Sequence, residues 1–174
     1  LGHELNQEKS DYFGARKEKL FLEGLTVFDN VLKMNEITGN QYDYAVEGFF
    51  SRVLYNYKNK YFFNASLRRD GSSVFSKENR WGTFYGLGAA WDISKEDFLK
   101  DSEVVNALKV KASYGQQGND IFYFPSTTDR IYYAYKNLYK VSNFGDDTPV
   151  VTTEYLGNNK LRWENSQNLN AGFE

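Results

Sequence analysis

The sequence predicts an all-β protein whose long antiparallel strands each have an apolar and a polar face. Three observations support this fold class. Aromatic residues make up 18% of the 174 residues although the mean hydropathy is −0.65, a combination typical of alternating strands. From Trp81 to Ile93 nearly every second residue is large and apolar, and the residues between are mostly small or polar. The connections between the predicted strands also vary strongly in length, from a few residues to several tens.

The first four predicted strands follow one another from the amino terminus. Residues 2–13 are a weak strand candidate. No strand is predicted in the polar and mixed segment that follows them, up to residue 41. Residues 42–57 and 61–70 alternate clearly and flank the tight turn "KNK". After Asp70, the residues Gly71-Ser72-Ser73 open a loop by ordinary turn chemistry. The fourth strand follows at 80–93.

The carboxyl-terminal half is predicted to hold a short helix and two further strands. Ser94 with Asp97 three residues later resembles a helix N-cap. The helix would place four apolar residues on one side: Phe98, Leu99, Val104 and Val105. Residues 107–115 alternate again, 116–160 show no clear period, and 161–174 read as a last strand. Loops beyond about 15 residues are uncommon in compact soluble domains, but they are ordinary on the extracellular side of membrane barrels.

Composition and charge exclude several classes of function. The chain has no cysteine and one histidine, His3, so disulfides, thiolate metal sites and histidine-based catalysis are not expected. No cofactor is predicted. The net charge is −2 and the basic residues are scattered, which argues against a nucleic-acid partner. Loop carboxylates that could suggest a catalytic or calcium site are interpreted as solvated: Asp120, Asp146, Asp147 and Glu154.

Two architectures fit the alternation, a sector of a membrane barrel and a soluble β-sandwich that binds carbohydrate or protein. Trp81 and Trp91 share a face and are ten residues apart, roughly 33 Å at about 3.3 Å per residue. Tilted by about 40°, that length spans the apolar band of about 25 Å between two aromatic girdles. Tyr57 and Tyr61 flank the short turn on the same parity, where an interface girdle belongs. Sandwich strands alternate too, although they usually have about five or six residues, so the pattern alone leaves both architectures open.

Parity distinguishes the two architectures. In a barrel the apolar parity meets lipid; it includes Phe49, Val53, Phe63, Leu67, Tyr85, Leu87 and Val110. The opposite parity then faces the lumen, where water or neighbouring protein groups solvate charges at little cost; it includes Arg52, Arg68, Lys109 and Lys111. In a sandwich the apolar face is buried and the charged face meets water.

Ordered motifs over nearly the whole chain resemble one known family. Residues 55–94 contain R-D-G-S-S followed by V-F, then N-R-W-G and W-D-I-S. This order resembles the barrel signature of the SusC/RagA-type TonB-dependent outer-membrane transporters. "LKVKASYGQQGND" at 108–120 and "YLGNNKLRWENSQNLNAGFE" at 155–174 resemble two later motifs of that family. The resemblance is weakest over 5–40 and 121–150.

The resemblance implies a fold, a location and partners. It implies one sector of a 22-stranded type of barrel in a Gram-negative outer membrane, with long extracellular loops and one short helical periplasmic connection. It implies uptake of glycans or oligopeptides without enzymatic chemistry, a SusD-like surface lipoprotein as a lid, and energy from TonB acting on a plug. Residues 1–174 are therefore expected to be a partial barrel domain without the plug domain or the C-terminal strand, since closure needs at least about eight strands.

The long loop is predicted to contain the residues that contact a ligand. The candidates are Tyr132, Tyr133, Tyr135 and Tyr139. A tyrosine offers a flat face for stacking and a hydroxyl for hydrogen bonds at low entropic cost. The alternative interpretation, that these rings pack the loop on itself or against a partner, is the more common outcome for such residues.

Overall fold

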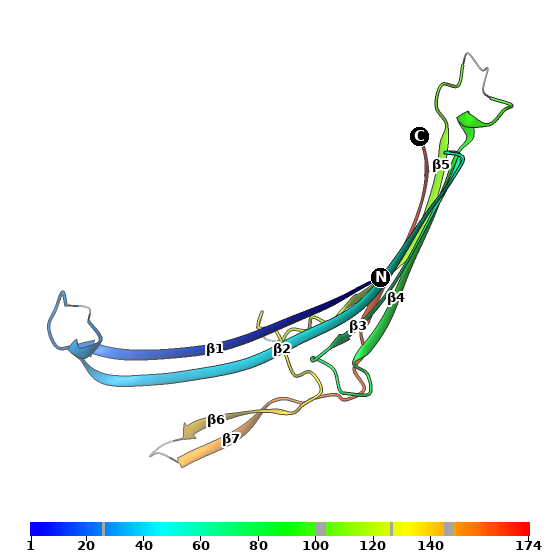
Figure 1. The fold of residues 1–174 in the computed structure, drawn as a ribbon. Helices are drawn as coiled ribbons and strands as arrows, with labels where there is room; N and C mark the ends of the chain where they lie inside the picture. Colours follow the sequence, from blue (N-terminus) through cyan, green and yellow to red (C-terminus); the bar gives the residue numbers. More distant parts are fainter. Residues whose placement is uncertain (26, 100–103, 126, 145–147) are drawn as a thin grey trace. The chain divides into compact units, whose positions relative to one another are not determined.

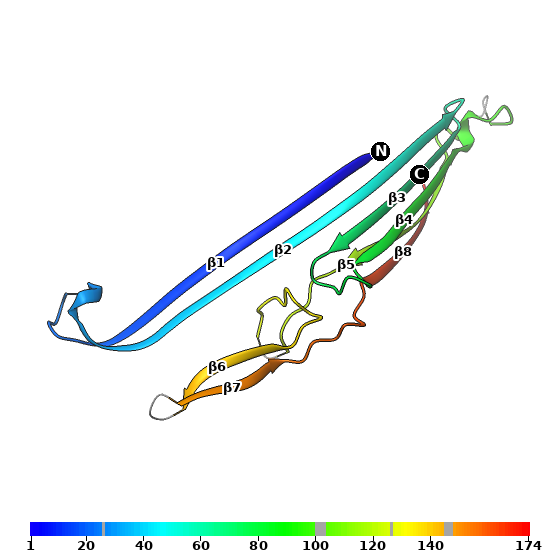
Figure 2. The ribbon, with the colours of Figure 1, turned by 60° about the horizontal axis from the view of Figure 1, so that its bottom comes forward.

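A computed structural model describes residues 1–25, 27–99, 104–125, 127–144 and 148–174. Six strands form one sheet in the order β1-β2-β3-β4-β5-β8, and β6 and β7 form a separate pair (Figures 1 and 2). The sheet strands are β1 (Gly2–Leu20), β2 (Val31–Tyr57), β3 (Tyr61–Ser72), β4 (Trp81–Asp92), β5 (Lys109–Asn119) and β8 (Glu164–Phe173). The remaining elements are β6 (Leu138–Phe144), β7 (Thr148–Tyr155) and two 3₁₀ helices, η1 (Phe28–Asn30) and η2 (Ile93–Lys95). No helix in these ranges is long and apolar enough to cross a membrane.

The chain divides into two compact units. Leu1–Asn6 and Ala45–Glu174 form the first, and Gln7–Tyr44 form the second. The second unit consists of the distal parts of β1 and β2 with their connection. In it the Tyr42 hydroxyl donates to Glu8 over 3.1 Å, and the Thr38 hydroxyl donates to the Gly14 carbonyl over 3.4 Å.

The six predicted strands are those of the large sheet, but several boundaries were wrong. β1 continues to Leu20 and β2 begins at Val31, so most of the segment 14–41 is strand. In the sequence of Gln7–Tyr44 large apolar residues do not recur regularly at every second position, so no apolar alternation marks these strands. β5 extends to Asn119, and β6 and β7 lie within the aperiodic stretch 116–160.

The tight turn between β2 and β3 comprises the three residues 58–60, which join the paired residues Tyr57 and Tyr61. Lys58 and Asn59 have φ values of 52° and 55°, the pair of positive angles that a type I′ turn requires and that matches strand twist. The Lys60 N–H donates to the Tyr57 carbonyl over 3.0 Å, which closes the turn and fixes the register of both strands.

The helical connection after β4 is confirmed only as one 3₁₀ turn, η2. The Ser94 hydroxyl donates to the Asp92 carboxylate over 2.7 Å instead of capping an α-helix. Phe98 and Val104 are strongly exposed, so a continuous helix here would have no apolar face to bury. The α-helix expected up to Val105 is thus absent from residues 96–99 and 104–105, and 100–103 lie outside the described residues.

The register places apolar and polar side chains on opposite faces. Directly opposite residues point to the same face, and one row across β2, β3, β4, β5 and β8 reads Val53, Ala65, Leu87, Tyr114 and Leu169. The adjacent row on the other face reads Arg52, Ser66, Gly86, Gly115 and Asn168. Val53, Leu87 and Leu169 are 53–78% exposed. A face this apolar and this exposed suits lipid rather than water.

The buried apolar residues of the first unit lie at one end of the sheet, in and beside its connections. They are Val74, Phe75, Phe84, Ile131 and Ala134. They come from the connection between β3 and β4, from β4 itself and from the connection between β5 and β8. The core of this unit therefore does not lie between two sheets, as a sandwich would require.

Leu169→Arg in the full-length protein is expected to prevent stable membrane assembly, because a charge at mid-depth on a lipid face costs about 2–4 kcal/mol. Asn168→Arg is the matched control, since it adds the same charge one residue away on the opposite face. Heat-modifiable migration of the folded protein in outer-membrane fractions measures the result. Equal assembly of the two variants would contradict the assignment of the faces.

Candidate functional site

Aromatic side chains form two rows at the two ends of the apolar face. Tyr61 lies 6.3 Å from Tyr57 and 6.2 Å from Trp91 between ring centroids, beside the short turn. At the other end the rings of Phe49 and Trp81 are 6.1 Å apart. The structure thus brings the predicted interface aromatics into two rows, as an aromatic girdle at each membrane interface requires. Their contact with lipid stays a prediction.

Glu96, which the sequence analysis did not identify, joins one aromatic row to the connection after η2. Its carboxylate accepts hydrogen bonds from the Tyr61 hydroxyl at 2.7 Å, the Trp91 indole at 3.0 Å and the Lys60 ammonium at 3.0 Å. The bonds from Tyr61, Trp91 and Lys60 lower the pKa of Glu96 to about 2 from its ordinary 4.5. No sequence signal singles out this glutamate, because its partners come from two other strands and a turn. We call Glu96 with these three donors the Glu96 clamp.

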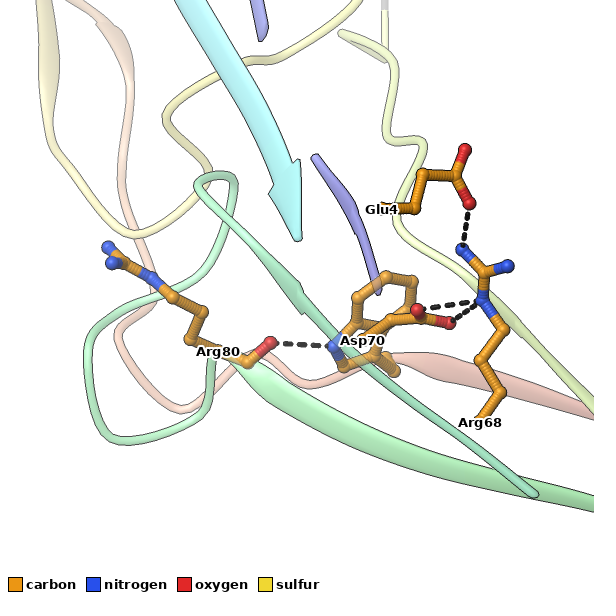
Figure 3. A network of polar contacts seen from close by, with 5 residues as sticks. Glu4, Arg68, Asp70 and Arg80 are labelled. Carbon is orange, nitrogen blue, oxygen red and sulfur yellow. Dashed lines mark hydrogen bonds and ion pairs between the residues drawn. The ribbon is translucent and has the colours of Figure 1, made fainter. Parts of the chain in front are cut away.

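The four predicted lumen cations share the polar face, and three of them have partners. Arg68 pairs with Asp70 at 2.7 Å and with Glu4 at 3.1 Å, as Figure 3 shows. Gly48 makes room for this network, since a Cβ at that position would collide with Asp70. Lys111 pairs with Glu174 at 2.8 Å. In addition, Lys109 lies 4.8 Å over the Phe62 ring, and Arg52 is exposed.

The family-like signature around the turn after β3 is explained residue by residue. Arg69 lies 5.4 Å over the Trp81 ring, and Gly71 lets that ring approach to 3.0 Å from where a Cβ would stand. The Ser72 hydroxyl donates to Asp120 over 2.6 Å. The Ser73 amide donates to the Ala45 carbonyl and its hydroxyl oxygen accepts from the Ala45 amide, both at 2.9 Å.

The signature continues into a cluster of rings at the sheet end. Phe75 is fully buried, and its ring centroid lies 5.8 Å from Phe122 and 5.4 Å from Trp163. Trp163 also packs against Phe84 at 5.5 Å, and its indole donates to the Arg80 carbonyl over 2.8 Å. We call the cluster the loop core: Val74, Phe75, Phe84, Phe122, Ile131, Ala134 and Trp163.

Glycines give Phe84 its place in the loop core. A Cβ at Gly82 would stand 2.6 Å from the Phe84 ring, and one at Gly118 would collide with the same ring. Side chains at either position would force Phe84 out of the cluster. The Asn79 amide further ties the two connections together, because it donates to the Asn159 carbonyl over 2.8 Å.

Asp120 is buried, so its interpretation as a solvated loop carboxylate was wrong. Its carboxylate accepts a hydrogen bond from the Ser72 hydroxyl and lies 3.6 Å from the Arg130 guanidinium. A buried carboxylate needs such partners, since leaving it unpaired would cost several kcal/mol. Asp120 therefore fixes the start of the long loop to the end of β3. The other three carboxylates of that group are either exposed, as Glu154 is, or lie outside the described residues.

The predicted ligand-binding tyrosines fall into two groups. The Tyr132 ring lies under Arg130 at 5.1 Å, and the Tyr133 and Tyr135 rings lie under Lys136 at 5.2 and 5.5 Å. These three rings are half-buried within the loop, so their faces are already engaged by cations. Tyr139 stands apart on β6 and is exposed. Ligand contact by any of the four stays a prediction.

The acidic and histidine side chains do not gather into a metal site. Within the described ranges no group of three or more His, Cys, Asp or Glu is arranged to hold an ion. His3 instead stacks on Phe49 at 4.6 Å and shares a hydrogen bond of 3.0 Å with Glu47.

Comparison with known proteins identifies relatives over almost the whole chain. A family model described as "TonB dependent receptor-like, beta-barrel" matches residues 3–174. The TonB-dependent receptor SusC of Bacteroides thetaiotaomicron is 37% identical over 82% of this chain and 14% of that protein. The TonB-dependent receptor P3 of Formosa agariphila is 40% identical over 72% of this chain and 12% of that protein. The chain thus spans only 12–14% of the length of these two relatives, which are receptors and not enzymes.

A solved structure shows the same fold. The RagAB peptide transporter aligns with a TM-score of 0.82 at 27% sequence identity, over 98% of this chain and 18% of that one. A second structure, of the RagAB peptide importer in the "open-open" state, aligns with a TM-score of 0.78. The predicted fold class is confirmed: the sheet is an antiparallel sector of a barrel and is not closed in this chain.

Phe75→Ala in the full-length protein is expected to loosen the connection between β5 and β8, because emptying a fully buried phenylalanine site costs about 3–5 kcal/mol. Limited proteolysis of intact cells should then cut within residues 120–163, while heat-modifiable migration shows that the barrel is still assembled. Tyr139→Ala removes an exposed ring of the same loop and should leave protease resistance unchanged. Full resistance of Phe75→Ala would show that the loop core does not hold the loop.

Glu96→Gln should lower the urea midpoint of the detergent-solubilised protein at neutral pH, since an uncharged amide cannot pair with Lys60. The pKa of Glu96 is depressed to about 2, so the carboxylate stabilises the folded state fully above its unfolded pKa of about 4.3. That contribution is lost as the pH falls through 2. The difference between wild type and variant should therefore shrink between about pH 4.5 and 2. Glu78→Gln, at an exposed carboxylate, is the control, and a pH-independent difference would contradict the clamp.

Proposed function

Because this chain belongs to the SusC/RagA-type TonB-dependent receptors, whose β-barrels are outer-membrane proteins, we propose that it is part of a nutrient-uptake transporter. The observation that carries the proposal is the exposed apolar row from Val53 to Leu169 on a sheet that matches solved barrels. A soluble binding module would have to bury that face. In this proposal the chain is barrel wall with loops, and it catalyses no reaction.

The lengths of the connections support one orientation in the membrane. Short turns of such barrels face the periplasm and long loops face outward. The turn 58–60, the shortest connection, would then be periplasmic, and the connection 120–163, the longest, extracellular. Because neighbouring strands are antiparallel, the connection 93–108 lies on the side of the turn 58–60 and the connection 73–80 on the side of 120–163. The face that carries Arg52, Arg68, Lys109 and Lys111 would line the lumen, where water or plug groups solvate these charges.

The substrate in this proposal is an oligosaccharide or an oligopeptide, and the partners follow the resemblance. The RagAB relative is described as a peptide transporter, and the SusC relative as a TonB-dependent receptor. A SusD-like surface lipoprotein would cover the extracellular side, and TonB would supply energy through a plug. Tyr139 is the best candidate for ligand contact, because its ring is exposed while Tyr132, Tyr133 and Tyr135 lie under cations.

A strain that lacks the full-length gene should lose uptake of either labelled oligosaccharides or labelled oligopeptides, and loss of TonB should have the same effect. In the complemented strain, Tyr139→Ala should raise the half-saturating substrate concentration several-fold, because one ring-stacking contact is worth on the order of 1 kcal/mol. Tyr139→Phe retains the ring and should stay near wild type if stacking dominates. Unchanged uptake of both substrate classes in the deletion strain would overturn the proposal.

A further inference from the structure

The sheet contains a gap between β4 and β5 at the end that carries the loop core. The register between the two strands stops at the pair Gly86 and Gly115. Both strands nevertheless continue, β4 back to Trp81 and β5 on to Asn119. A cavity of about 390 Å³ lies beside this part of β4. We call it the wall notch, and the lining residues that matter here are Glu78, Asn79, Trp81, Thr83, Arg162 and Asn165.

The wall notch opens on the apolar face of the sheet. Trp81 and Thr83 have the same parity as Leu87 on β4, and Asn165 has that of Leu169 on β8. In a sector of an outer-membrane barrel, this is the face that meets lipid. The Trp81 ring also belongs to one of the two aromatic rows, which places the notch at the level of one membrane interface. A lipid headgroup is therefore the group that the notch would contact.

Two arginines border the notch. Arg69 lies on β3 directly opposite Thr83, and its guanidinium is 5.4 Å from the centre of the Trp81 ring. It is the one charged residue on the apolar face of β3, all of which is described. Arg162 lines the notch and is exposed. Among the described residues neither guanidinium pairs with a carboxylate, so both remain available to an external anion.

The carboxylates near the notch do not cancel these two cations. Glu78 is the acidic residue that lines the notch, and in the described part of the chain it forms no ion pair with Arg162. Glu47 lies on the same face in the row of Trp81, two strands away, and it shares a hydrogen bond of 3.0 Å with His3. The notch thus has a positive excess, which favours an anionic headgroup over a neutral one.

We propose that the wall notch binds the headgroup of a membrane lipid that carries an anionic phosphate. Arg69 and Arg162 provide charge-assisted hydrogen bonds to phosphate oxygens. Thr83 and Asn165 add a hydroxyl and an amide that can donate to the same headgroup, and neither side chain has a partner among the described residues. The Trp81 ring holds Arg69 in place by cation–π attraction. The proposal depends on the membrane location of the barrel and not on the proposed transport function.

The test places photo-reactive benzoylphenylalanine at position 85 of the full-length protein, next to Thr83 on the apolar face, in nanodiscs with equal amounts of phosphatidylglycerol and phosphatidylcholine. Anionic phosphatidylglycerol should form about tenfold more adduct, because the arginines repel the choline group of the other lipid. The same probe at position 55, an exposed tyrosine on the same face of β2, should label both lipids equally. Equal labelling at position 85, or the same preference at both positions, would overturn the proposal. Loss of the preference when inorganic phosphate is added at the lipid concentration would also overturn it, since the site would then recognise the free anion.

Two pairs of variants separate the notch from a general attraction of lipid to charge. Arg69→Gln with Arg162→Gln should abolish the preference at position 85, whereas Arg52→Gln with Lys109→Gln, which removes two cations of the opposite face, should retain it. Asn165→Trp fills the notch and should also abolish the preference. Gln167→Trp, on the same face two residues along β8, should retain it. Heat-modifiable migration shows whether each variant is assembled. A preference that is kept by both members of a pair, or lost by both, would contradict the assignment of the site.

Discussion

Strict alternation of side chains along paired strands is the constraint on which the rest of this structure depends. A slip of one residue between neighbouring strands would turn every side chain of one strand to the other face. The type I′ turn at Lys58 and Asn59 sets the register of β2 against β3. The rows that follow, apolar on one side and small or polar on the other, then continue to β8 without interruption. Placement of charges, rings and glycines follows from that register.

The motif R-D-G-S-S-V-F provides structure rather than ligand chemistry in this chain. Three of its residues have partners from other elements: Arg69 meets Trp81, Ser72 meets Asp120, and Ser73 meets Ala45. Val74 and Phe75 then fill the loop core. The motif therefore holds the connections after β3 and after β5 together at one end of the sheet, and the rest of the long loop, with β6 and β7, begins from this fixed base.

The sequence alone predicted the elements that have an alternating face and missed those that do not. The strands around Val53, Leu87 and Val110 were found because one side is apolar along their whole length. The strands between Gln7 and Tyr44 were missed because large apolar residues do not recur regularly at every second position there. Asp120 and Glu96 were missed for another reason: Glu96 has a partner, Tyr61, that is 35 residues away in sequence, and Asp120 has a partner, Ser72, that is 48 residues away. No local pattern encodes such pairs. The interface aromatics required only parity and spacing, which a sequence contains.

The Glu96 clamp has a consequence for how this part of the wall meets the bilayer. Interfacial Tyr and Trp side chains ordinarily direct their O–H and N–H groups to lipid headgroups and water. Here the hydroxyl of Tyr61 and the indole N–H of Trp91 are both donated to one carboxylate of the protein. Their rings are held by the polypeptide and not by whichever headgroup is nearby. We therefore expect the depth of this edge in the membrane to depend little on lipid composition.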